Sequence, residues 1–306
     1  MSPTIELFTA SDGYRSQYRR WAPAAAPPKA HLVALHGIQS HSGWYEYSSE
    51  RLCDAGYEVS FLDRRGSGFN DADRGHAVHW ERLVNDVVQF LTALRVRSAS
   101  GANRLQRPVV LLAVSWGGKL AAVTAARRPE LIDALALLYP GLCAKVRPRW
   151  DQVARLRLAE LLDIRRKLVP IPLRDPALFT GEPIWQEFIR RDERALHDVT
   201  TSFLIANREL DRLVVATAES IRCPVLMMLP GRDRIINNEA TRRYFDRVAS
   251  LNKRLIEYPA AQHTLEFEPN RDEFITDLIR WLDDSAGQAF QPDSVSAPGR
   301  KSGWKA

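Results

Sequence analysis

Short apolar runs of strand length recur along the chain, with amphipathic segments between them. The runs lie within residues 31–37, 57–68, 108–115, 134–141, 223–233 and 253–259. Between two of these runs, Leu83, Val87 and Phe90 recur at helical spacing. Runs that are apolar throughout are typical of strands buried on both faces. The alternation therefore predicts an α/β fold, in which helices cover both faces of a mostly parallel sheet.

Three parts of the chain, its start, its middle and its end, do not follow this alternation of apolar runs and amphipathic segments. Two polar-alternating runs around Asp12 and Gly13 predict an antiparallel hairpin at the edge of the sheet. Residues 142–212 are rich in Arg, carry five prolines and are mostly helical in pattern, which predicts an inserted helical cap. We expect residues 1–141 and 213–284 to form the core beneath it, and residues 285–306 to be a disordered tail.

Composition and charge indicate which kinds of molecule the protein is expected to bind. The 306 residues are 45% hydrophobic and 26% charged, as in ordinary globular proteins. The formal net charge is +6, but the arginines are spread along the chain, with no basic block interleaved with aromatic residues. This distribution argues against a nucleic-acid partner. It is compatible with peripheral contact between a basic cap and anionic lipid.

Several patterns that would indicate export, a membrane span or a cofactor do not occur in the sequence. The N-terminus lacks the pattern of a signal peptide, and no run approaches the roughly 20 apolar residues that span a bilayer. The cysteines, Cys53, Cys143 and Cys223, lack metal-ligand spacing. The stretch DRRGSG lacks both the P-loop Lys and the G-x-G-x-x-G spacing of nucleotide sites, and we expect His36 to be structural. We therefore expect a cytoplasmic, reduced protein without metal or cofactor.

One apolar run ends in a serine at a sharp turn, in the stretch Ala113-Val114-Ser115-Trp116-Gly117. This is the G-x-S-x-G elbow between a strand and a helix, with Ala in place of the first Gly. In an open parallel sheet, binding and catalytic residues lie at the carboxyl ends of the strands, and Ser115 is expected at such an end. Ser115 is therefore a candidate nucleophile, and a helix-capping serine is the structural alternative.

A serine nucleophile needs a base, and the base needs a carboxylate to orient it. His263 follows the last apolar run and Asp233 follows the run before it, so both are expected at carboxyl ends of strands. The order Ser, Asp, His is the order of the α/β-hydrolase architecture. For an oxyanion, we expect the backbone N–H of Trp116, next to the serine, and that of Ile38, in the loop after the first run.

With these residues assembled, the chain resembles the monoacylglycerol lipase and lysophospholipase branch of the α/β-hydrolase fold, a serine aminopeptidase-like family. The resemblance covers most of residues 4–284. It rests on six motifs in the order the family shows: LHGIQSHSGWYE, DRRGSG, RGH, VSWGGKLA, GRDRII and HTLEFEPNRDEF. It implies a cofactor-free serine hydrolase that cleaves carboxylic esters, often lipid esters, through an acyl-enzyme.

The resemblance assigns Ser115, Asp233 and His263 to a catalytic triad, and the backbone N–H groups of Ile38 and Trp116 to an oxyanion hole. The first Ala of the elbow departs from the family pattern, and the cap has no stretch that matches a lipid-specific member. An acyltransferase, an amidase or a lactonase would use the same triad. A ligand-binding homologue without catalysis is the alternative outside the enzymes.

Overall fold

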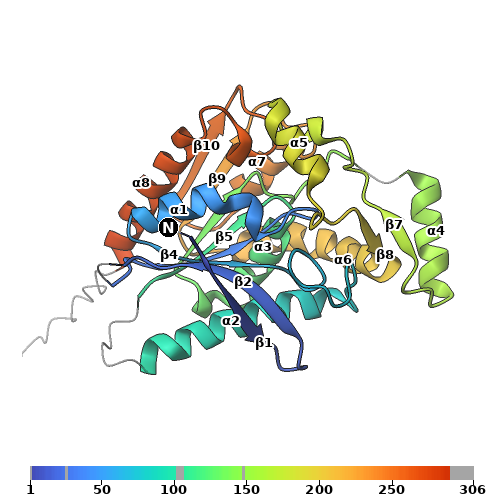
Figure 1. Cartoon of the computed structure of the whole chain (residues 1–306), viewed down its shortest axis with the longest axis horizontal. Helices are drawn as coiled ribbons and strands as arrows, with labels where there is room; N and C mark the ends of the chain where they lie inside the picture. Colours follow the sequence, from blue (N-terminus) through green and yellow to red (C-terminus); the bar gives the residue numbers. More distant parts are fainter. Residues whose placement is uncertain (1, 25–26, 101–106, 147–148, 290–306) are drawn as a thin grey trace, which may run out of the picture.

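The computed structural model describes residues 2–24, 27–100, 107–146 and 149–289. Its centre is an eight-stranded sheet (Figure 1). The strands, in order across the sheet, are β1 (Thr4–Thr9), β2 (Arg15–Trp21), β4 (Glu58–Leu62), β3 (His31–Leu35), β5 (Val109–Val114), β6 (Ala134–Leu138), β9 (Val225–Pro230) and β10 (Lys253–Tyr258). β2 pairs antiparallel with β1 and β4, and all other neighbours in this sheet are parallel. The predicted α/β fold with a mostly parallel sheet is confirmed.

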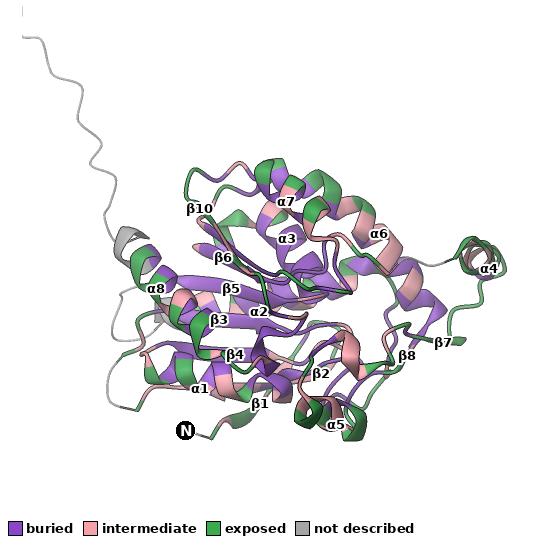
Figure 2. Ribbon diagram, turned by 90° about the horizontal axis from the view of Figure 1, so that it is seen from above, coloured by how far each residue is buried: buried purple, intermediate pink, exposed green. Residues whose placement is uncertain are grey.

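Helices cover both faces of the sheet, and Figure 2 shows the buried strands between them. Helices α1 (Glu46–Asp54) and α8 (Asp272–Ala289) pack on one face. The other face is covered by α2 (Trp80–Ser100), α3 (Gly117–Arg127), α6 (Thr201–Thr217) and α7 (Asn238–Asp246). Alternate residues of β5 point into the two resulting cores. Both of its faces are buried, which is why its sequence is apolar throughout.

The N-terminal hairpin has the predicted position and pairing. β1 lies at the edge of the sheet and pairs antiparallel with β2 from Thr4 opposite Arg20 to Thr9 opposite Arg15. The turn needs a residue with positive φ, and Gly13 supplies it with φ +81°. The Gly13 N–H donates to the carbonyl of Ala10 over 2.9 Å.

The segment between β6 and β9 contains α4 (Trp150–Leu161), β7 (Leu168–Pro170), α5 (Pro183–Arg191), β8 (Asp198–Thr200) and α6. The pattern predicted helices here and missed the short antiparallel pair of β7 and β8. α4 projects from the body of the molecule (Figure 1). α6 runs past residue 212, the predicted end of the cap, to Thr217 and packs on α3.

The predicted disordered tail starts at 285, but α8 continues to Ala289, and residues 290–306 lie outside the described residues. Among the described helices, none is long and apolar enough to cross a membrane.

Candidate active site

Ser115 lies in the turn between β5 and α3 and has a backbone φ of +48°. A left-handed conformation costs a residue with a side chain about 1–2 kcal/mol, so the surrounding structure must impose it. The Ser115 carbonyl accepts hydrogen bonds from the N–H groups of Gly118 and Gly141, at 2.9 and 2.5 Å. A Cβ on Gly117 would lie 2.7 Å from the backbone oxygens of Leu35 and His36, so a glycine lets α3 begin against the end of β3.

The structure brings Ser115, His263 and Asp233 together from the ends of three strands. His263 follows β10, and its Nε2 lies 3.0 Å from Ser115 Oγ. Its Nδ1 lies 2.8 Å from Oδ2 of Asp233, which follows β9. The other carboxylate oxygen, Oδ1, accepts the N–H groups of Ile235 and Ile236 at 2.7 and 2.9 Å. The carboxylate is thus fixed by two backbone donors while its free oxygen orients the imidazole.

Aromatic rings enclose His263. The rings of Tyr139 and Phe179 meet the imidazole edge to face, with centroids 5.1 and 5.9 Å away. Phe179 belongs to an aromatic cluster from three parts of the chain, formed by Trp44, Phe179, Trp185, Phe188 and Phe267. His263 and Asp233 are both buried. The pair is therefore shielded from water, which strengthens its electrostatic interaction.

The two backbone groups predicted for the oxyanion flank Ser115. Trp116 follows it at the N-terminus of α3, where the helix dipole is positive. A Cβ on Gly37 would lie 3.3 Å from Ser115 Cβ, so the peptide that joins Gly37 to Ile38 passes beside the serine. Within the described residues, neither the Ile38 nor the Trp116 N–H has a protein acceptor. Two unpaired donors beside a serine can stabilise an oxyanion.

The predicted structural role of His36 agrees with its contacts. Its Nδ1 lies 2.7 Å from the carbonyl oxygen of Gly37, and its Nε2 accepts the N–H of Arg64 at 2.9 Å. Since Nε2 accepts, we place the ring proton on Nδ1, where it donates to Gly37. Burial lowers the pKa of His36 well below its usual value, so the ring is neutral.

The contacts of Arg64 with this loop were not predicted from the sequence. The stretch DRRGSG is one of the motifs that carry the family resemblance and lacks the pattern of a nucleotide loop, and neither observation gives Arg64 a role. In the structure, Arg64 Nη1 and Nη2 donate to the carbonyl oxygens of Gly37 and Ile38, each over 3.1 Å. The guanidinium also lies 4.7 Å from the centroid of the Trp116 ring. No local pattern indicates such a contact between two loops.

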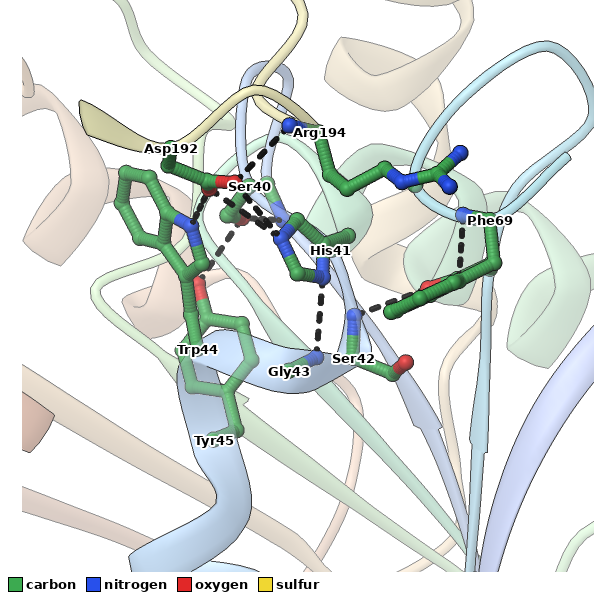
Figure 3. Close-up of polar contacts among 12 residues, drawn as sticks. Ser40, His41, Ser42, Gly43, Trp44, Tyr45, Phe69, Asp192 and Arg194 are labelled. Atoms are coloured by element: carbon green, nitrogen blue, oxygen red, sulfur yellow. Dashed lines mark hydrogen bonds and ion pairs between the residues drawn. The ribbon is translucent and has the colours of Figure 1, made fainter. Parts of the chain in front are cut away.

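A second missed feature joins the loop after β3 to the end of α5. The carboxylate of Asp192 accepts the indole N–H of Trp44 at 2.5 Å and the Nε2–H of His41 at 3.1 Å (Figure 3). We call this set of contacts the Asp192 bridge. Burial raises the pKa of Asp192, but the hydrogen bonds from His41 and Trp44 outweigh it and hold this pKa below its usual value. Its partners lie about 150 positions away in sequence, and His41 was not predicted to be part of a site.

A metal centre is not apparent in the described part of the chain. No group of three or more His, Cys, Asp or Glu side chains there is arranged to hold an ion. The polar side chains at the site are instead joined to one another in the chain Ser115, His263, Asp233.

The chain is similar to several known proteins. The serine aminopeptidase S33 family (Hydrolase_4) matches residues 26–270. A monoacylglycerol lipase of Mycolicibacterium smegmatis is 27% identical over 280 residues, which cover 90% of this chain and 95% of that protein. The phospholipase YtpA of Bacillus subtilis is 25% identical over 266 residues, or 83% of this chain and 95% of that protein. A soluble variant of Saccharomyces cerevisiae monoglyceride lipase, solved with a substrate analog, has the same fold, with a TM-score of 0.82 at 16% identity, covering 93% of this chain and 96% of that one.

Proposed function

The chain belongs to the serine aminopeptidase S33 family of α/β-hydrolases and is an ester-hydrolysing serine hydrolase, and from this premise we propose that Ser115, His263 and Asp233 are its catalytic triad. The observation that carries the proposal is the chain of two short contacts, 3.0 Å from Ser115 Oγ to His263 Nε2 and 2.8 Å from His263 Nδ1 to Asp233 Oδ2. Both distances are within hydrogen-bond reach for a nucleophile, its base and the group that orients the base.

In the proposed mechanism, Ser115 Oγ attacks the ester carbonyl carbon while His263 Nε2 takes its proton. Asp233 stabilises the imidazolium that forms. The N–H groups of Ile38 and Trp116 bind the negative oxygen of the tetrahedral intermediate. The imidazolium then protonates the departing alcohol, which leaves an acyl-enzyme on Ser115. Water, deprotonated by His263, attacks the acyl-enzyme, and the imidazolium then returns this proton to Ser115 Oγ as the acid is released.

The substrate we propose is a monoacylglycerol-like or lysophospholipid-like ester. Two relatives are a monoacylglycerol lipase and a phospholipase, and the aromatic cluster beside His263 suits an apolar acyl chain. In this proposal, residues 142–212 act as a cap that selects the substrate, because they contribute Phe179, Trp185 and Phe188 to the cluster. Transfer of the acyl group to an alcohol or amine would use the same triad.

The test is intact-protein mass spectrometry after exposure to a fluorophosphonate, on the wild-type protein and on Ser115→Ala. We expect a single adduct on the wild type and none on the variant. Ser115→Ala should also lose ester turnover while its thermal unfolding midpoint stays nearly unchanged. An adduct on the variant, or retained turnover, would show that another residue is the nucleophile.

We also propose that α4 contacts anionic lipid. Trp150 and Leu161 are each 81% exposed, far more than is usual for side chains of their size. Arg149 directly precedes Trp150 and Arg155 lies in the same helix; their side chains are about four-fifths exposed, and both pair with Asp151. Exposed apolar and cationic groups on a projecting helix are typical of segments that lie in a lipid interface.

Vesicle flotation tests this contact, with vesicles of phosphatidylglycerol and phosphatidylcholine compared with phosphatidylcholine alone. We expect binding to the anionic vesicles that weakens as NaCl rises, because salt screens the arginines. The double variant Trp150→Ala/Leu161→Ala should lose it. Leu251→Ala is the matched control, since Leu251 is fully exposed on a different surface loop. Binding that does not change with ionic strength would contradict the proposal. An equal loss of binding in Trp150→Ala/Leu161→Ala and in Leu251→Ala would contradict it as well.

A further inference from the structure

Arg64 lies in the loop after β4 and is bonded to the loop that carries Ile38. Its two terminal nitrogens donate to neighbouring carbonyl oxygens, those of Gly37 and Ile38. Within the described residues it forms no ion pair, in contrast to its neighbour Arg65, which pairs with Asp12 and Asp86. The fork of the Arg64 guanidinium is therefore directed at backbone rather than at a carboxylate.

The first of these bonds has a consequence for the oxyanion hole. The Gly37 carbonyl and the Ile38 N–H belong to the same peptide unit. In a planar trans peptide these two groups point in opposite directions. Arg64 Nη1 and His36 Nδ1 both hold the Gly37 oxygen, at 3.1 and 2.7 Å. The Ile38 N–H must then point away from Arg64 and His36.

Ser115 lies close to this peptide, so an N–H turned away from Arg64 and His36 can face the serine. A Cβ on Gly37 would come within 3.6 Å of Ser115 Oγ. Hydrogen bonds accepted by a carbonyl also polarise its peptide, which makes the N–H a better donor. The contacts of Arg64 and His36 therefore favour both the direction and the strength of the Ile38 donor.

Arg64 also contacts the residue that supplies the second donor. Its guanidinium lies 4.7 Å from the centroid of the Trp116 ring, at a distance where cation–π attraction operates. The indole is held by a second contact, because Trp116 Nε1 donates to Asn207 Oδ1 over 2.7 Å. One side chain thus touches both residues of the oxyanion hole.

From this arrangement we propose that Arg64 is a positioning residue of the oxyanion hole. Its side chain orients the Ile38 N–H and keeps Trp116 at a fixed position beside it. The inference rests on the proposed function, since that function gives Ile38 and Trp116 their role. Burial lowers the pKa of Arg64 to about 9, so the group remains cationic at neutral pH. Its charge adds to the field that stabilises a negative oxygen.

The experiment compares Arg64→Gln and Arg64→Lys with the wild type, using p-nitrophenyl butyrate as substrate. Loss of one oxyanion donor costs on the order of 10²–10³ in kcat. Arg64→Gln leaves the Ile38 N–H in place but no longer fixes its direction. We therefore expect a smaller loss, on the order of 10–100-fold in kcat, with KM nearly unchanged. Arg64→Lys keeps the charge but lacks the fork, so its kcat should lie between the two. It also serves as the test if Arg64→Gln does not fold.

A second measurement separates positioning from general damage. Butylboronic acid forms a tetrahedral adduct on the serine, whereas p-nitrophenyl butyl ether only fills the pocket. The affinity for the boronic acid should fall with kcat in the Arg64 variants, while the affinity for the ether stays the same. Arg65→Gln is the matched control. It removes two ion pairs, so it should lower the unfolding midpoint and leave kcat unchanged.

Two results would overturn the inference: a kcat for Arg64→Gln close to that of the wild type, or a parallel loss of affinity for the boronic acid and the ether. Failure of the proposed function would be seen separately, as a wild-type protein that neither turns over the ester nor reacts with the fluorophosphonate.

Discussion

Backbone strain at single residues is concentrated around the proposed nucleophile. Four described residues other than glycine have positive φ, and two of them, Ser115 and Tyr139, lie at the site. Such conformations persist only where the surrounding structure enforces them, and they are frequent at active sites. At Ser115 the enforcing contacts are the hydrogen bonds that Gly118 and Gly141 donate to its carbonyl. The elbow motif predicts this strain because its small residues leave room for the turn.

The strain at Ser115 can be measured by comparing Ser115→Gly with Ser115→Ala. Both variants should lack turnover. Glycine adopts φ +48° without the steric cost that a Cβ adds, so we expect Ser115→Gly to be more stable than Ser115→Ala by about 1 kcal/mol. Urea unfolding at pH 7 gives the difference. Equal stabilities would mean that the elbow is not strained.

The carboxylate of Asp233 gives a second prediction at this scale. Asp233→Asn places an amide where His263 needs an acceptor, so the wrong tautomer forms and kcat should fall by roughly 10⁴. Steady-state kinetics measures it. Asp277→Asn is the control, because that carboxylate pairs with Tyr258 and Arg280 away from the serine. A loss below about tenfold would indicate that another acid orients the imidazole.

At the scale of elements, a buried glutamate ties the turn after His263 to helix α1. Glu266 lies in the short helix η5 (Leu265–Phe267), and its Oε1 accepts the N–H of Ser48 over 2.9 Å. Ser48 is in the first turn of α1, where N–H groups lack partners within the helix. Glu266 is only 2% exposed, and this burial raises its pKa to about 7.

The raised pKa predicts how stability changes with pH. Between pH 4.5 and about 7, the folded protein binds the Glu266 proton more tightly than the unfolded chain does. The contribution of the neutral carboxyl is therefore fully present below pH 4.5 and is lost as pH rises through about 7. It amounts to on the order of 3 kcal/mol.

Glu266→Gln removes this titration, because an amide does not ionise in this range. From pH 5 to pH 8, urea unfolding should show the wild type losing stability relative to the variant. Glu257→Gln is the control, since Glu257 pairs with Arg242 on the exposed surface. A constant difference between Glu266→Gln and wild type across this range would mean that Glu266 is ionised throughout.

The elements themselves were largely predictable from the sequence. Continuous apolar runs require strands buried on both faces, and β5 illustrates this, since its alternate residues enter two separate cores. The pair β7 and β8 was not predictable, because each strand has only three residues and is too short for a period to show. Residue 212, where the predicted cap ends, lies within α6, because this helix belongs both to the segment after β6 and to the layer that packs on α3.

At the scale of the whole molecule, the sequence predicted which residues meet at the ends of strands and missed contacts between loops. Ser115, Asp233 and His263 could be placed together because parallel strands end at one edge of the sheet. Arg64 and the Asp192 bridge follow no such rule. Their partners are separated by 26 to 151 positions and belong to loops whose paths depend on packing. The contacts that join residues 142–212 to the core could therefore not be predicted from the sequence.

The Asp192 bridge predicts how firmly the end of α5 is held against the loop after β3. The backbone adds one bond nearby, from Leu196 N–H to the Gln39 carbonyl at 2.9 Å, but the carboxylate accepts from both Trp44 and His41. Asp192→Ala leaves these two buried donors unpaired, at a cost of about 1–3 kcal/mol each. The end of α5 should then open more often.

Trypsin detects this opening, because Arg190 and Arg191 end α5 directly before Asp192. An Asp directly after the cleaved Arg slows trypsin by itself, so the informative cut is the one after Arg190, where both residues of the cleaved bond are unchanged. We expect this cut to be faster in Asp192→Ala than in the wild type at pH 7, while Ser115 still reacts with the fluorophosphonate. Asp198→Ala is the control, since Asp198 lies in the same segment and, within the described residues, its carboxylate makes a single long contact, to Arg174 at 3.5 Å. The pKa of Asp192 is lowered, so the bridge contributes stability above pH 3.8 and loses it as pH falls further. Equal cutting of wild type and Asp192→Ala at pH 7 would mean that the aromatic contacts of Trp44 hold α5 in place without the carboxylate.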